Sequence, residues 1–335
     1  AVASHMVPLA VGTQTNGSVI RPASFCGVVG FKPTVGLVSQ DFIIPISSSQ
    51  DTAGPMTKTV MGAAMMLNAM ATGAAKTDYA ATLDAAALQG KRIGVLRGAQ
   101  GSSPLVKDSF EQALSAMESA GAILVDIDDI DMPDGFWGKS FDVLKYEFKA
   151  TLNAYLASTP DTVTTRTLAD LIAFNAEHAD IELALFNQDI FEQSEGMEDL
   201  ESDGYKEAVA FVQSATRENG IDRLLAEHDV VALVAPSGPL APRADPVNGD
   251  VWPDWAGAGY AAAIAGYPHL TVPMGTVRGI PIGLSFMGGK DQDAAILSLG
   301  YAYEQRTQAR AEPRYYQTAL YRANNCTQVQ ISALP

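Results

Sequence analysis

The sequence has 335 residues, 47% of them apolar, and its 38 acidic and 22 basic residues give a net charge of −16. This length suffices for one large domain or two smaller ones with buried cores. The acidic balance argues against nucleic acids and anionic membranes as partners, because both select basic surfaces. Two cysteines are too few for a disulfide framework or a four-cysteine zinc site. No apolar run reaches about 18 residues, so no transmembrane helix is expected.

Strand-like and helix-like segments alternate through the first third of the chain. Residues 1–57 are rich in Gly, Ser, Thr and Pro, which predicts strands and tight loops. Residues 58–72 predict a helix and 92–96 a buried strand; a helix over 104–120 and a strand over 122–126 follow. This alternation predicts an α/β fold with a mixed sheet flanked by helices.

A long charged stretch interrupts the alternation. Residues 137–227 are mostly helical in pattern, with Leu168, Leu171 and Ile172 at helical spacing. Two interpretations stay open: a helical excursion that forms a layer or lid, or surface helices packed on the sheet.

The sheet pattern returns towards the C-terminus. Strands are predicted over 230–236, 270–273 and 280–287, and a helix over 291–309. We therefore expect one domain over residues 1–316, with the excursion inside it, and a C-terminal tail over 317–335.

A run of small and turn-forming residues surrounds one serine in Gly12-Thr13-Gln14-Thr15-Asn16-Gly17-Ser18. A serine nucleophile needs exposure, a base and hydrogen-bond donors for the oxyanion. Gly17 lets a substrate carbonyl approach the backbone. The backbone N–H groups of Thr15, Asn16, Gly17 and Ser18 are candidates for an oxyanion nest. The segment therefore nominates Ser18 as a nucleophile.

Other interpretations of this segment must be weighed. The spacing of Gly12 and Gly17 suits a phosphate loop, but Ser18 stands where that motif requires lysine. A Gly-x-Ser-x-Gly nucleophile elbow is absent, and Asn16 also begins a glycosylation pattern that is common by chance. On spacing alone, a turn without chemistry is as well supported as a nucleophile.

No convincing base for Ser18 emerges from the residues. Of the four histidines, His178 and His228 lie among charged helical residues, and His269 precedes a predicted strand, which favours a structural role. No His-x-x-x-His pair indicates a metal site, and no Ser-x-x-Lys motif is present.

The segment 12–34 closely resembles the core of the amidase signature family, from Gly12 to Ser18 and again from Pro22 to Thr34. Asp51-Thr52-Ala53-Gly54-Pro55-Met56 and Gly279–Leu284 are similar to later family elements, so the resemblance covers residues 1 to about 316. The stretches around Tyr146–Lys149 and Arg166–Asn175 resemble the bacterial peptide amidase branch.

The resemblance implies acyl transfer to water without a metal or cofactor, through a nucleophile, a relay serine in a cis peptide and a lysine base. The nucleophile matches Ser18, whereas family spacing places the relay serine and the lysine before Ala1. Ser4 does not match the relay position, and Lys32 is not the family's catalytic lysine. A desolvated lysine is the kind that can be neutral.

The implied substrates are small or peptide amides. Alternatives are a carbamate, aryl-amide or ester hydrolase of the same family, and a non-catalytic amidase-like subunit of a complex. Two departures are Asn16, where the family usually has Gly, and Gln14, where many relatives have Asp.

Supporting residues follow from physical inference. We expect Arg21 and Asp51 to pair and hold the loops around Ser18. The excursion and the loop over 236–255 are expected to build the substrate pocket. Trp252 and Trp255 are candidates for its apolar walls.

Overall fold

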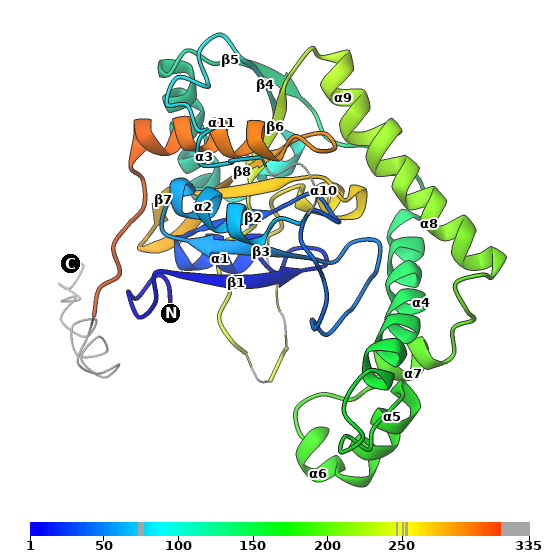
Figure 1. Ribbon diagram of the computed structural model, residues 1–335. Helices are drawn as coiled ribbons and strands as arrows, with labels where there is room; N and C mark the ends of the chain where they lie inside the picture. The colour runs from blue at the N-terminus through cyan, green and yellow to red at the C-terminus, as the bar shows by residue number, and fades with distance from the viewer. Residues whose placement is uncertain (73–76, 246, 250, 252–253, 316–335) are drawn as a thin grey trace, which may run out of the picture.

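The computed structural model describes residues 1–72, 77–245, 247–249, 251 and 254–315. Its centre is one eight-stranded mixed sheet with strand order β1-β3-β2-β7-β8-β6-β4-β5 (Figure 1). The strands are β1 (Leu9–Gln14), β2 (Val29–Lys32), β3 (Thr52–Thr57), β4 (Arg92–Leu96), β5 (Ile123–Ile127), β6 (Ala232–Pro236), β7 (His269–Val277) and β8 (Ile280–Met287). Strand β4 pairs in parallel with β5 and β6, and the other pairs are antiparallel. The predicted α/β fold with a mixed sheet is confirmed.

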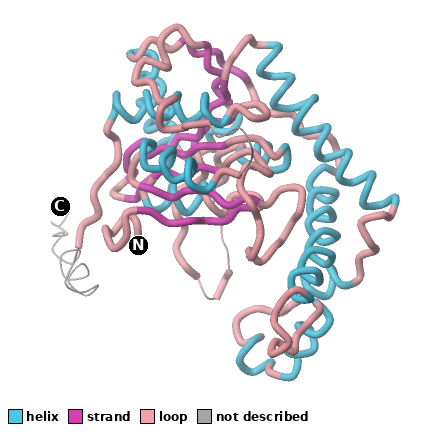
Figure 2. Tube along the Cα trace, in the orientation of Figure 1, coloured by secondary structure: helices cyan, strands magenta, loops and turns pink. Residues whose placement is uncertain are grey.

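Helices cover the sheet and extend away from it (Figure 2). They are α1 (Ile20–Cys26), α2 (Val60–Met70), α3 (Pro104–Ser119), α4 (Phe136–Ala157), α5 (Leu168–Glu177), α6 (Ala179–Glu182), α7 (Asp189–Glu195), α8 (Asp203–Thr216), α9 (Asp222–Glu227), α10 (Gly259–Ala265) and α11 (Asp293–Thr307), with short helices η1 (Gly98–Gln100) and η2 (Arg217–Ile221). Within the described residues, no helix is both long and apolar enough to cross a bilayer.

At strand β6, both faces of the sheet are buried. In β6, Val234 joins the apolar cluster that includes α2, α3 and α11, whereas Leu233 and Ala235 join the cluster that includes α10. Successive residues of a strand point to opposite faces. A strand covered on both sides therefore reads as one continuous apolar run, which is the pattern that predicted it.

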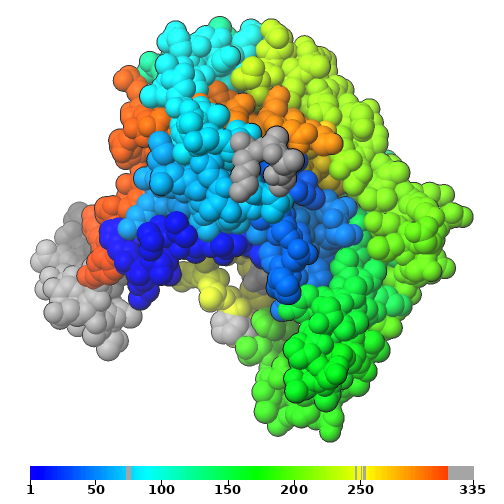
Figure 3. Space-filling view, viewed as in Figure 1, coloured from blue at the N-terminus to red at the C-terminus, as the bar shows by residue number. Residues whose placement is uncertain are grey.

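The helical excursion has a small core of its own. Phe136 and Val143 of α4 pack with Val212 of α8, and Ile264 of α10 joins the same cluster. Helices α4 to α7 stand beside the sheet, and a hollow lies open between them and β1 (Figure 3). Ile264 of α10 is therefore one of the contacts through which the excursion is attached to the rest of the fold.

Helix α1 corrects the expectation of strands and loops alone over residues 1–57. Pro22 falls in the first turn, where a missing N–H is tolerated, and Gly27 ends the helix at φ 63°. A Cβ built at Gly30 would lie 2.6 Å from Cβ of Ala23, so glycine there lets α1 pack closely against β2. The predicted tail over 317–335 lies outside the described residues, as does Trp252.

Candidate active site

Ser18 is exposed in the turn that joins β1 to α1. The buried side chain of Gln14 fixes this turn: its Oε1 accepts hydrogen bonds from N–H of Val19 (2.9 Å) and Ile20 (3.0 Å), and its Nε2 donates to the carbonyl of Asn16 (2.9 Å). Gln14 thus satisfies donors at the start of α1, whose N-cap Val19 makes no side-chain cap. An ionised Asp at position 14 would lack a donor for the Asn16 carbonyl.

The turn leaves backbone donors available. Among the described residues, no acceptor pairs with the backbone N–H groups of Thr15, Asn16, Gly17 or Ser18. Unpaired donors next to an exposed hydroxyl are what an oxyanion site requires. Their assignment to an oxyanion stays a prediction.

Asp51 anchors the turn from the neighbouring loop. Its Oδ1 accepts from the hydroxyl of Thr15 (2.7 Å), and its Oδ2 accepts from N–H of Ile46 (2.7 Å) and Ser47 (2.9 Å). Burial raises the pKa of Asp51, and these hydrogen bonds oppose the rise. The loop over 46–51 is thereby tied to the residue three positions before Ser18.

Glu147 of α4 continues this connection into the excursion. Its fully buried carboxylate accepts from the hydroxyl of Ser47, from N–H (3.1 Å) and hydroxyl (3.0 Å) of Ser49, and from the hydroxyl of Tyr205 (2.7 Å) on α8. Burial and the bond to Glu147 raise the pKa of Tyr205. We call Thr15, Ser47, Asp51, Glu147 and Tyr205 the acidic network.

Sequence reasoning assigned no role to Glu147. The available signal was its position one helical turn after the buried Val143, which places it on the buried face of α4.

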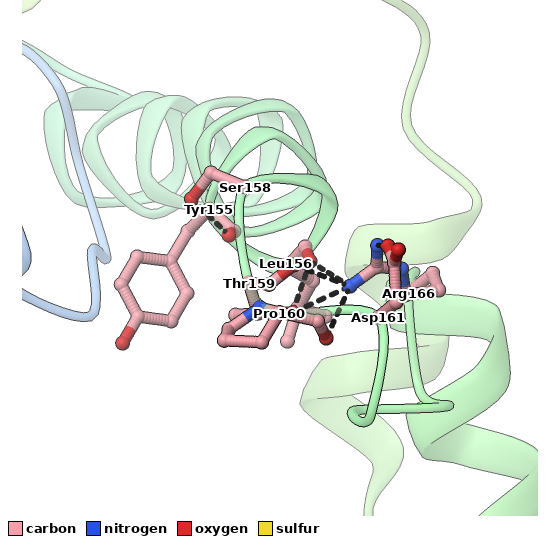
Figure 4. Close-up of polar contacts among 7 residues, drawn as sticks. All are labelled: Tyr155, Leu156, Ser158, Thr159, Pro160, Asp161 and Arg166. Atoms are coloured by element: carbon pink, nitrogen blue, oxygen red, sulfur yellow. Dashed lines mark hydrogen bonds and ion pairs between the residues drawn. The ribbon is translucent and has the colours of Figure 1, made fainter.

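Arg166 fixes the C-terminal end of α4 (Figure 4). Its Nη1 donates to the carbonyls of Leu156 (3.3 Å), Thr159 (2.8 Å) and Pro160 (3.2 Å) and to the hydroxyl of Thr159 (2.7 Å). A cation near a helix C-terminus satisfies carbonyls left without helical partners. The α4–α5 connection is therefore closed by a residue of the segment that resembles the peptide amidase branch.

Arg21 and Asp51 do not pair, which corrects the prediction of an ion pair. The guanidinium of Arg21 lies 4.4 Å from the ring centroid of Trp255, and burial lowers the pKa of Arg21. Stacking on indole is a favourable arrangement for guanidinium. Opposite charges in neighbouring loops were a weak basis for pairing, because Asp51 finds hydroxyl and backbone donors nearer to it.

His269 reaches the other side of the turn. Its Nε2 lies 2.6 Å from the hydroxyl of Ser285, which donates to Ser237 (3.0 Å), whose hydroxyl is 2.6 Å from that of Thr271. Burial lowers the pKa of His269 to about 3, so the ring is neutral. We call Ser237, His269, Thr271 and Ser285 the neutral network. The sequence indicated a structural role for His269 but not its proximity to Gly17.

Comparisons with known proteins identify the family of this chain. The model of the amidase family matches residues 1–297. This chain belongs to the amidase family. It is 32% identical to a probable amidase of Arabidopsis thaliana over 94% of its own length, and it spans 60% of that relative. A putative amidase of Arthroderma benhamiae is 34% identical over 90% of the chain, which spans 54% of that relative. The structure of native peptide amidase from Stenotrophomonas maltophilia is 41% identical with a TM-score of 0.84, and the match covers 94% of this chain and 65% of that one.

Proposed function

We propose that this chain carries the nucleophile, Ser18, of an amidase that hydrolyses small or peptide amides. The main support is an exposed serine in a turn clasped by Gln14, beside backbone N–H groups that are free to bind an oxyanion. Family membership and the similarity to a peptide amidase point to the same chemistry.

In the proposed reaction, Oγ of Ser18 attacks the amide carbonyl and the C–N bond then breaks. The backbone N–H groups of Thr15 to Ser18 stabilise the tetrahedral oxyanion. The Oγ proton passes through the relay serine and the lysine to the leaving amine. Water then attacks the acyl-enzyme, which releases the acid and restores the hydroxyl of Ser18.

The lysine and the relay serine are proposed to come from residues before Ala1. Lys32 is fully buried, and burial lowers its pKa to about 7, yet its Nζ donates to the carbonyl of Pro33 (2.9 Å). Desolvation alone therefore does not make Lys32 the base for Ser18.

Fluorophosphonate labelling tests the proposal. The protein expressed from its complete gene and the 335-residue chain are treated in parallel. Intact mass and peptide mapping should show one adduct on Ser18 in the complete protein and none in Ser18→Ala. An unlabelled complete protein would overturn the proposal and favour a non-catalytic subunit. Comparing amide, urethane and aryl-amide substrates then separates the same-family alternatives.

A further inference from the structure

A small cavity lies against the nucleophile turn. It measures about 20 Å³ and is bordered by Gly17, Arg21, Ser237, Trp255 and His269. A water molecule needs roughly 10–15 Å³ on such a measure, so the cavity takes one or two non-hydrogen atoms. An occupant of this cavity lies against Gly17, the residue that precedes the proposed nucleophile in the chain.

The neutral network determines which nitrogen of His269 carries the proton. The hydroxyl of Ser285 donates to Ser237 and therefore accepts from Nε2–H of His269. A neutral imidazole has only one N–H, so Nδ1 is left as a bare acceptor.

This acceptor has no partner within the described part of the chain, although it is buried. Gly259 lies against the same edge of the ring: a Cβ there would be 2.6 Å from Cε1 and 3.2 Å from Nδ1 of His269. Glycine thus keeps this edge open. A buried acceptor without a protein partner indicates a donor that the chain itself does not supply.

The charge around the cavity restricts that donor. The guanidinium of Arg21 lies at the cavity and stacks on Trp255. A cationic ligand would be repelled there, and an alkyl group would leave Nδ1 of His269 unsatisfied. A neutral N–H or O–H group satisfies both conditions.

We propose that this cavity is a substrate subsite in which Nδ1 of His269 accepts a hydrogen bond from one neutral donor of the amide substrate. The inference rests on the proposed function and adds a specificity-determining residue to it. The donor is an N–H from one of two sources, the amide nitrogen that leaves or the amide nitrogen on the acyl side.

The variant His269→Gln tests the subsite, because the Gln amide reaches the Nε2 position but offers no acceptor at Nδ1. The matched control is Thr271→Val, which perturbs the neutral network at its far end. Three substrates are compared: a peptide primary amide, its N,N-dimethylamide, and an analogue with an ester oxygen in place of the acyl-side N–H.

For the primary amide, His269→Gln is expected to lower kcat/KM by about 10- to 100-fold, the effect of leaving a buried donor unpaired. The analogue that lacks the recognised N–H should show no such dependence, which identifies the source. Thr271→Val should leave the ratios between substrates unchanged. Equal changes for all three substrates, or no change, would overturn the subsite.

Two further measurements separate this inference from the proposed function. The rate of fluorophosphonate labelling at Ser18 should be the same in His269→Gln and wild type, because fluoride leaves without a hydrogen bond to the cavity. If the wild type failed to label, the proposed function would be contradicted and the subsite would lose its proposed substrate, but the acceptor at Nδ1 would still be testable. Nitrogen-15 NMR of the His269 ring then still decides, since a proton on Nδ1 would rule out the acceptor.

Discussion

The acidic and neutral networks approach the Ser18 turn from different parts of the molecule. The acidic network joins segments far apart in the chain, because Glu147 of α4 binds the loop over 46–51. The neutral network lies within the sheet, where Thr271 and Ser285 are cross-strand partners on β7 and β8. Carboxylates form strong charge-assisted bonds that can order loops. Neutral groups instead allow a buried acceptor to stand beside a substrate without the desolvation penalty of a charge.

The largest expected effect on stability comes from removing Glu147, the central carboxylate of the acidic network. Glu147→Ala leaves the hydroxyls of Ser47, Ser49 and Tyr205 without their acceptor and opens a cavity, so we expect a loss of about 3 kcal/mol in the free energy of unfolding. Urea unfolding measures it. The control Glu192→Ala removes an exposed carboxylate of the same excursion and should change stability by less than about 0.5 kcal/mol. Equal losses in the free energy of unfolding for the two variants would show that the acidic network does not stabilise the fold.

The next largest effect is expected from adding one methyl group at Gly283, beside the neutral network. A Cβ at Gly283 would overlap the hydroxyl oxygen of Thr271 and lie 3.1 Å from that of Ser237. We expect Gly283→Ala to destabilise the protein by about 1–3 kcal/mol, the usual range for overpacking a core. Gly138 of α4 is the matched control, since its Cβ would meet nothing within 4 Å. Gly138→Ala should stabilise the helix by roughly 0.5–1 kcal/mol. If Gly283→Ala left the free energy of unfolding unchanged, the hydroxyls of Thr271 and Ser237 would have room to move.

These two networks also mark the limit of what the sequence could predict. Strand β4 coincides with the predicted 92–96, because a buried strand is a local apolar run. Ser18 was nominated as the nucleophile from a contiguous motif. Glu147 and His269 were missed as neighbours of that motif, because burial and strand pairing bring them there from more distant parts of the chain. The pairing of Arg21 with Asp51 was wrong because complementary charge says nothing about nearer partners.

The smallest expected effect is the pH dependence that His269 of the neutral network gives to stability. His269 has a folded pKa of about 3 against an ordinary value of 6.5, lowered first by burial and then by the charge of Lys32, its cross-strand partner on β2. Arg21, at the same cavity, also disfavours a second positive charge. Between these pH values the unfolded chain binds a proton that the folded chain excludes.

The contribution of His269 to stability is therefore complete above pH 6.5 and is lost as the pH falls towards about 3. The loss amounts to at most about 1.4 kcal/mol for each pH unit. Carboxylates also titrate in this window. The informative quantity is therefore the difference in the free energy of unfolding between wild type and His269→Gln, measured in urea at each pH. That difference should shrink steadily below pH 6.5. A difference that is independent of pH would mean that His269 takes up a proton in the folded protein as readily as in the unfolded chain. Nδ1 would then not be held as a bare acceptor.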